Sequence, residues 1–290
     1  MGDQIILVAE SGADIPKEYV DKYNLHIVDM HVTFGNETRD DSTVSGEDVV
    51  DFYRRTGKLP KTSACNPADF EEAFDTLHAE YPDARLLYLA YSAVTTSSYQ
   101  SAMVAIEDRE YIKPFDTKLV SFGESFFVVT LAKAILKHPE WTIDDAYSAA
   151  EKLRSKFHMC FIPQNLTFLK AGGRVSNAGA LIGNVLKIVP RINILDGYLV
   201  ADKKYRGRFD KTIEKAFREM DEKYHYARDL LWIGMGPGFY EKYKDTVQKL
   251  AESMGFRKLV WCPTGAVITT HGGPGAFGIA GCEENSGFEL

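Results

Sequence analysis

The residues best suited to chemistry surround a lone arginine in the segment 165–177. Arg174 follows Gly172 and Gly173 directly, and the hydroxyl residue Ser176 comes two positions later. Glycine lets the backbone approach a ligand closely, and the planar, permanently charged guanidinium group suits a carboxylate or a phosphate. We therefore expect an anionic ligand at this segment.

Two loops rich in hydroxyl groups could hold the same anion. Residues 92–98, which include Ser92 and Thr96, lie between an expected strand and an expected helix. Thr62 and Ser63 come shortly before another expected helix. Free backbone N–H groups and the helix dipole favour an anion at such helix starts, and hydroxyl groups add donors. Simple helix caps would use the same residues, so both interpretations stay open.

A histidine near the C-terminus is the last candidate. His271 lies in the segment 269–275, where an expected strand over 266–269 runs into a glycine-rich turn. Histidine can donate to an anion or exchange a proton near neutral pH, and a purely structural role in the turn is the alternative. The chain contains no Gly-x-Ser-x-Gly, Walker or His-Glu-x-x-His motif, and no spacing that supports a metal site.

The composition is that of a folded protein without a nucleic-acid partner. Of 290 residues, 45% are hydrophobic and 26% charged, and the net charge is -7 without any run of consecutive basic residues. The four cysteines show neither disulfide nor metal spacing, which favours a reducing cytoplasm. No signal peptide and no apolar run long enough to span a bilayer are present. We expect a cytoplasmic protein without a transmembrane segment, for which transient membrane contact stays open.

The elements that must position these residues alternate in the first half of the chain. Asn66 is a good helix cap, and Pro67 suits the first helical position. Strand followed by helix, repeated, predicts a parallel sheet covered by helices. We expect strands over 5–9, 86–91 and 119–122, and helices from Pro16 and over 46–55, 67–77, 98–106 and 124–136.

The second half has a different rhythm. Asp196 and Gly197 stand between apolar runs and predict a hairpin turn. We expect helices over 142–157, 210–224 and 239–254, and strands over 161–162, 191–194, 198–200, 230–233, 259–261 and 266–269. The chain is therefore expected to be an α/β protein of two domains. They are an N-terminal parallel sheet covered by helices (1–157) and a C-terminal mixed α/β domain (158–290).

Taken together and in order, several segments resemble the DegV family. They are Glu10–Pro16, Lys61–Ser63, Tyr99–Ala102, Leu169–Ser176, Leu186–Ile188, Asp196–Gly197 and Thr270–Gly275. The resemblance covers nearly the whole chain. It implies two α/β domains with a long-chain fatty acid buried between them and no cofactor. Members that act as carriers present the carboxylate to a separate fatty acid kinase.

The resemblance also implies roles for single residues, and it breaks at the hydroxyl loop. Thr62 would hydrogen-bond the carboxylate, with Arg174 and His271 near the head group or at the kinase docking face. The family pattern is Ser-Ser-x-Leu-Ser-Gly-Thr, and this chain has Ser-Ala-Val-Thr-Thr-Ser-Ser at 92–98. The second serine is thus Ala93. Further departures are Thr95 for leucine, Ser97 for glycine, Glu10 for aspartate in the first loop, and Ser121-Phe122 for Asp-Ser or Asp-Thr.

Three hypotheses follow. The first is a non-enzymatic fatty acid carrier whose head-group residues are Thr62, Ser63, Ser92, Thr96, Arg174 and His271. The second is an enzyme or binder of a smaller carboxylated or phosphorylated metabolite, and the third is an interaction module without a ligand. A long, apolar cavity would favour the first and a short, polar pocket the second.

Overall fold

The computed structural model describes residues 2–175 and 188–290, and the first sheet of the protein is parallel, as predicted. Among the described residues it has four strands in the order β2-β1-β6-β7. These are β1 (Ile5–Glu10), β2 (His26–Val28), β6 (Arg85–Ala90) and β7 (Ile112–Asp116). Strands β1 and β6 are buried along almost their whole length, because helices cover both faces of the sheet.

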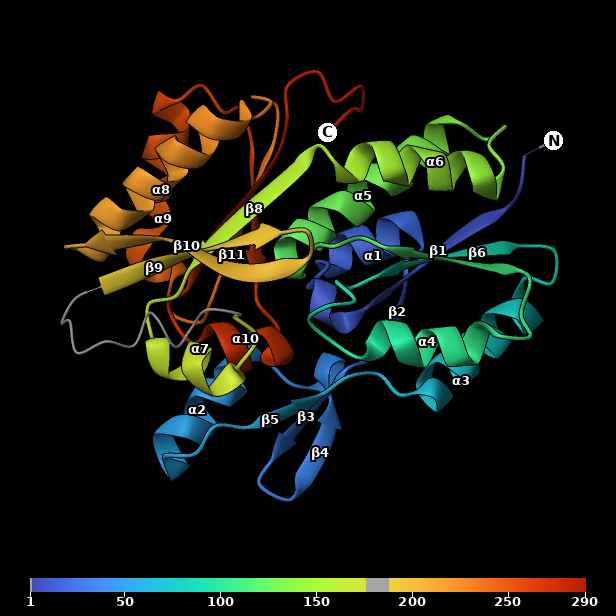
Figure 1. Ribbon diagram of the computed structural model, residues 1–290, viewed down its shortest axis with the longest axis horizontal. Coiled ribbons are helices and arrows are strands. Elements are labelled where there is room, and N and C mark those ends of the chain that lie inside the picture. Colours follow the sequence, from blue (N-terminus) through green and yellow to red (C-terminus); the bar gives the residue numbers. More distant parts are fainter. Residues whose placement is uncertain (1, 176–187) are drawn as a thin grey trace.

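The helices around this sheet form two layers. They are α1 (Lys17–Tyr23), α3 (Pro67–Glu80), α4 (Ser98–Ile106), α5 (Ser121–Lys137) and α6 (Ile143–Arg154). Helices α5 and α6 lie on one face and α3 and α4 on the other (Figure 1). The predicted cap is present: the Asn66 side chain accepts from two backbone N–H groups at the start of α3.

The second sheet is mixed and combines six strands in the order β10-β9-β8-β13-β11-β12 within the described residues. They are β8 (Phe157–Ile162), β9 (Ile188–Leu195), β10 (Tyr198–Arg206), β11 (Leu231–Met235), β12 (Leu259–Pro263) and β13 (Phe277–Cys282). Strands β9 and β10 form the predicted hairpin around Asp196 and Gly197. Helices α8 (Phe209–Tyr224) and α9 (Tyr240–Ser253) pack together beside this sheet (Figure 1).

A small antiparallel sheet and short helices complete the described fold. The sheet has the order β4-β3-β5, and its strands are β3 (His31–Phe34), β4 (Glu37–Asp40) and β5 (Lys61–Ser63). The helices are α2 (Gly46–Thr56), α7 (Leu166–Gly172), α10 (Ala266–Gly272) and the 3-10 turns η1 (Ser11–Ala13) and η2 (Asp41–Thr43). Helix α10 packs against both α2 and α7. No helix of the described residues is long and apolar enough to cross a membrane.

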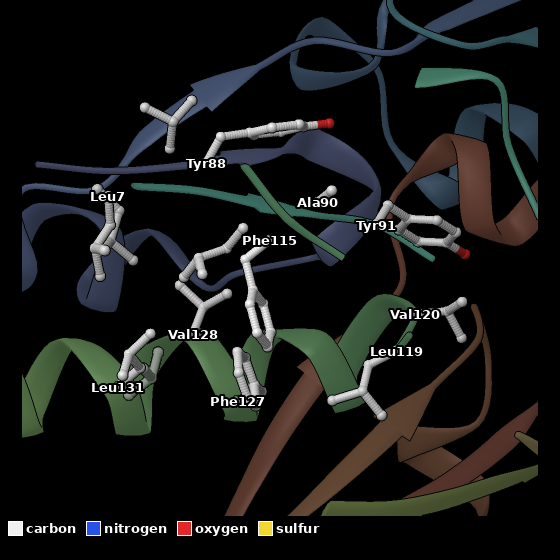
Figure 2. Close-up of a cluster of buried hydrophobic side chains, with 14 of the residues drawn as sticks. Leu7, Tyr88, Ala90, Tyr91, Phe115, Leu119, Val120, Phe127, Val128 and Leu131 are labelled. Carbon is white, nitrogen blue, oxygen red and sulfur yellow. The ribbon is translucent and has the colours of Figure 1, made fainter. Parts of the chain in front are cut away.

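Helix α5 joins the two larger sheets. It contacts α6 as well as strands β8, β11 and β13, and its residues 121–132 are all buried. Towards the parallel sheet, the rings of Phe115 and Phe127 stack at 5.9 Å (Figure 2). Towards the mixed sheet, Phe126 stacks on Trp232 at 5.5 Å. A helix that is apolar on every side belongs in such an interior position.

Two predicted strands are wrong. Residues 119–122 contain the end of a loop and the start of α5, and the parallel strand that follows β6 in the chain is β7 instead. Residues 266–269 belong to helix α10, although three of them, Val267, Ile268 and Thr269, have branched side chains that favour strands. In both places a short apolar run is buried for tertiary reasons, and periodicity cannot separate a buried strand from a buried helix turn. The division of the chain after residue 157 stays a prediction.

Candidate functional site

A cavity of about 340 Å³ lies between the parallel sheet and the mixed sheet. Its described lining includes residues of strands β5, β8, β10, β11 and β13, of segments that follow β6 and β7, and of helices α7 and α10. This is the carboxyl-terminal edge of the parallel strands, where open α/β sheets place their ligands. Most of the lining is apolar. The polar side chains are Thr62, Ser63, Tyr91, Thr95, Thr96, Ser97, Ser121, Arg174, Thr264 and His271.

Thr62 and His271 meet at this cavity although 209 positions separate them in the chain. Strand β5 carries Thr62, which pairs with Val32 of β3. Helix α10 carries His271 in its last turn, so the histidine does not follow a strand as predicted. The Thr62 Oγ1 atom lies 2.9 Å from His271 Nε2. The two residues form one hydrogen-bonded pair.

The His271 imidazole is neutral near pH 7. Burial, and secondly the charge of Arg174, lower the pKa of His271 to about 4. Its Nδ1 atom is buried without a hydrogen-bond partner in the described structure, and it faces Gly172 so closely that a Cβ there would lie 2.6 Å away. If Nε2 carries the proton, it donates to Thr62, and the threonine hydroxyl can then donate to an anion in the cavity.

Arg174 lines the cavity and is also exposed to solvent. It follows Gly173, which ends α7 with a positive φ of 64°, a conformation that suits glycine. The Arg174 Nη1 atom donates to the Gly172 carbonyl at 2.8 Å. Its charge helps to lower the pKa values of both His271 and Tyr91, so it provides positive potential within the cavity. Ser176 and residues 186–187 lie outside the described residues.

The hydroxyl loop divides into two parts. Thr96 lines the cavity, and its Oγ1 accepts at 3.3 Å from the backbone N–H of Ser98, the first residue of α4. Ser92 is fully buried, and its hydroxyl donates to the Gly197 carbonyl at 2.9 Å. Lys118 forms an ion pair with Asp196 in the same turn. Ser92 therefore attaches the hairpin turn to the loop, and it is not among the described residues that line the cavity.

The structure brings five of the six predicted site residues to one cavity. Thr62, Ser63, Thr96, Arg174 and His271 all line it, with Ser63 exposed, and Ser92 lies apart from them. Sequence reasoning found these residues through their glycine and helix-start context. It had no means of ranking Ser92 against Thr96, since both are hydroxyl residues of one loop.

Sequence reasoning did not foresee the burial of two carboxyl groups, those of Glu10 and Glu124. The Glu10 Oε2 atom accepts from the backbone N–H of Tyr91, a cavity residue, at 2.6 Å. Burial raises the pKa of Glu10 to about 7. Glu124 is buried on α5, and neither of its oxygens has a hydrogen-bond partner in the described structure. Burial, and then the nearby Glu10, raise the pKa of Glu124 well above its usual value. Nothing in the sequence distinguishes Glu124 from a surface residue.

Comparison with known proteins identifies the family to which the chain belongs. A family model described as "Uncharacterised protein, DegV family" matches residues 4–284. The chain belongs to the DegV family. A fatty acid-binding protein of Thermotoga maritima is 27% identical to this DegV chain over 281 residues, which cover 95% of the chain and 96% of the relative.

Solved DegV structures share the fold. A DegV family protein from Thermus thermophilus, described as binding fatty acid, matches with a TM-score of 0.86 at 22% identity. The match covers 97% of this chain and all (100%) of that protein. A DegV family protein from Eubacterium eligens, loaded with heptadecanoic acid, matches with a TM-score of 0.80 at 18% identity over 97% of this chain and 100% of that protein. At these identities the likeness establishes the two-sheet α/β fold.

The departure at Ala93 has a structural counterpart in this DegV protein. The Ala93 backbone N–H donates to Asp116 at 3.3 Å, and Ala93 is not among the described cavity residues. Thr95, Thr96 and Ser97 of the same loop do line the cavity. Hydroxyl donors are thus available two to four positions further along the loop.

Proposed function

We propose that this DegV protein binds a long-chain fatty acid, with the acyl chain in the apolar part of the cavity and the carboxylate at Thr62. The observation that carries the proposal is the cavity itself, in which several polar side chains, Thr62 among them, interrupt a mostly apolar lining. Burial of an acyl chain contributes about 0.8 kcal/mol per CH₂ group, so a long chain can supply most of the affinity. The relatives named or described as binding fatty acids support the same assignment.

The head-group residues suit a carboxylate without neutralising it completely. Thr62 and Thr96 offer neutral hydroxyl donors, and the neutral His271 can orient the Thr62 hydroxyl through their 2.9 Å hydrogen bond. Arg174 supplies the positive charge from a partly solvated position. A carboxylate held in this way stays chemically accessible, whereas a buried bidentate arginine pair would enclose it.

We further propose that the protein is a carrier that presents the carboxylate to a fatty acid kinase and does not itself catalyse a reaction. Arg174 supports this role, because it lines the cavity and is exposed, so one side chain can face both the ligand and a docked partner. The mostly apolar lining favours this role over turnover of a small carboxylated or phosphorylated metabolite, which would need a polar pocket.

Solvent extraction of the purified protein followed by mass spectrometry tests the binding proposal. We expect a fatty acid to co-purify in a molar amount close to that of the protein, and delipidated protein to rebind hexadecanoic acid in a calorimeter. Absence of any acyl species together with no rebinding would refute it. Incubation of the loaded protein with a bacterial fatty acid kinase and ATP tests the carrier role: acyl phosphate should form only when all three are present.

A further inference from the structure

The side chain of Phe122 lies against two glycines that face each other in the mixed sheet. Gly234 of β11 pairs directly with Gly278 of β13. A Cβ on Gly234 would lie 2.1 Å from Phe122 Cδ1, and a Cβ on Gly278 would lie 2.2 Å from Phe122 Cζ. Glycine within a strand weakens a sheet and often marks a close approach of another group. Here the approaching group is the Phe122 ring, and no residue larger than glycine fits beneath it at position 234 or 278.

Hydrogen bonds of the preceding residue and burial fix the position of the Phe122 ring. Phe122 follows Ser121, whose φ of 46° is unusual for a residue other than glycine. The Ser121 hydroxyl donates to the Asp14 carboxylate, which also accepts from the Gly265 N–H at 2.7 Å. Phe122 itself is 4% exposed. Figure 2 shows the preceding residues, Leu119 and Val120, at the same start of α5. The ring is therefore a fixed part of the wall.

Phe122 also marks where the cavity ends along the mixed sheet. Gly234 and Gly278 line the cavity together with Phe122. Two residues along the same strands, on the same face of the sheet, Trp232 pairs with Ala280, and neither residue is among the described cavity lining. Trp232 is instead fully buried and stacked on Phe126 of α5. The open space stops at the Phe122 ring, and packed core begins behind it.

We propose that Phe122 sets the length of acyl chain that this protein accepts. In this proposal the carboxylate lies at Thr62, and the end of the acyl chain meets the wall that Phe122 forms. Met159 closes the wall beside it, since its sulfur occupies the space next to Gly123, at 2.1 Å from where a Cβ would lie. The inference rests on the proposed function, because chain length matters only if the ligand is a fatty acid.

The test is the dependence of affinity on chain length, measured by calorimetry with decanoic, dodecanoic, tetradecanoic, hexadecanoic and octadecanoic acid on delipidated protein. Each buried CH₂ group raises affinity roughly fourfold until the chain meets the wall, after which the gain stops. The chain length at which the gain stops is the break. In Phe122→Ala the break should move to longer chains, so that each CH₂ group added beyond the wild-type break still raises affinity roughly fourfold. Phe122→Leu, which keeps an apolar side chain, should move the break less. It replaces the alanine variant in the test if the alanine variant does not fold.

Phe126→Ala is the matched control. It truncates a buried ring one turn further along α5, outside the described cavity lining, and should leave the break unchanged. An unchanged break in folded Phe122→Ala or Phe122→Leu overturns the proposed role of Phe122 and leaves fatty acid binding intact. A Phe126→Ala variant that moves the break as far as Phe122→Ala does also overturns the proposed role of Phe122 and leaves fatty acid binding intact. Failure of the wild-type protein to bind any of the five acids overturns the proposed function and, with it, this inference.

Discussion

Replacement of Glu10 by glutamine should remove a large part of the pH dependence of stability. The Glu10 side chain is fully buried, and its Oε2 atom accepts from the Tyr91 backbone N–H at 2.6 Å. Glutamine has the same shape, and its amide oxygen can still accept that hydrogen bond. The substitution therefore removes the ionisation and retains the contact, so a change in pH dependence reports on the carboxyl group itself.

The magnitude follows from the shift in proton affinity. Burial raises the pKa of Glu10 from 4.5 to about 7 in the folded protein. Between these pH values the folded state binds more protons than the unfolded state, so stability falls as pH rises from about 4.5 to 7 and is level above that. Because a tenfold change in proton affinity corresponds to about 1.4 kcal/mol, Glu10 should lower the free energy of unfolding by roughly 3 kcal/mol across this range.

Urea unfolding of the wild-type and Glu10→Gln proteins at a series of pH values measures this contribution. The free-energy difference between variant and wild type should move in favour of the variant by roughly 3 kcal/mol from about pH 4 to about pH 8. Glu71→Gln, at an exposed glutamate on α3, controls for the loss of one negative charge. A difference that is constant with pH, or one that grows towards acid, would show that the fold does not disfavour the Glu10 carboxylate.

Three further predictions concern the cavity. Thr62→Val should weaken fatty acid binding roughly tenfold to a hundredfold in calorimetry, because a hydrogen bond to a charged group contributes about 1.5–3 kcal/mol, and Thr62→Ser should restore it. Gly172→Ala should lower the free energy of unfolding by about 1–3 kcal/mol, because its Cβ would lie 2.6 Å from His271 Nδ1. Gly272→Ala, where a Cβ meets nothing within 4 Å, should not lower it, and equal losses would contradict the steric argument. Ser92→Ala should cost about 1 kcal/mol of stability and leave fatty acid affinity unchanged, whereas a large affinity loss would instead place Ser92 at the head group.

Local signals in the sequence predicted much of the fold. Asn66 and Pro67 predict the start of α3 because capping and the fixed φ of proline act within a few residues. Asp196 and Gly197 predict the hairpin for the same reason, since a turn depends on its own residues. Alternating strands and helices predict the parallel sheet through a general packing rule. These features need no knowledge of distant neighbours.

Features that depend on distant neighbours were missed or mistaken. Strand β4 (Glu37–Asp40) is exposed along its whole length, so it has no alternating pattern for a sequence analysis to detect. Helix α10 contains strand-favouring residues and forms because α2 and α7 pack around it. At the site, the approach of Thr62 to His271 depends on how the small sheet meets α10, and this cannot be read from residues 209 positions apart. Glu124 is buried only because α5 lies between two sheets.

The polar and apolar ends of the cavity share a structural support in Asp14. Its carboxylate accepts from the Ser121 hydroxyl and so fixes the residue that precedes Phe122. The same carboxylate accepts from the backbone N–H of Gly265. Gly265 is the N-cap residue of α10, and α10 carries His271. The Cys262 thiol, just before α10, donates to the Asp14 carbonyl. Because one side chain holds both elements, a ligand that contacts Phe122 and the Thr62–His271 pair together should stabilise both sheets against separation. Fatty acids long enough to reach both ends bury more apolar surface and bind more tightly, so at equal free concentration they should raise the melting temperature more than short ones.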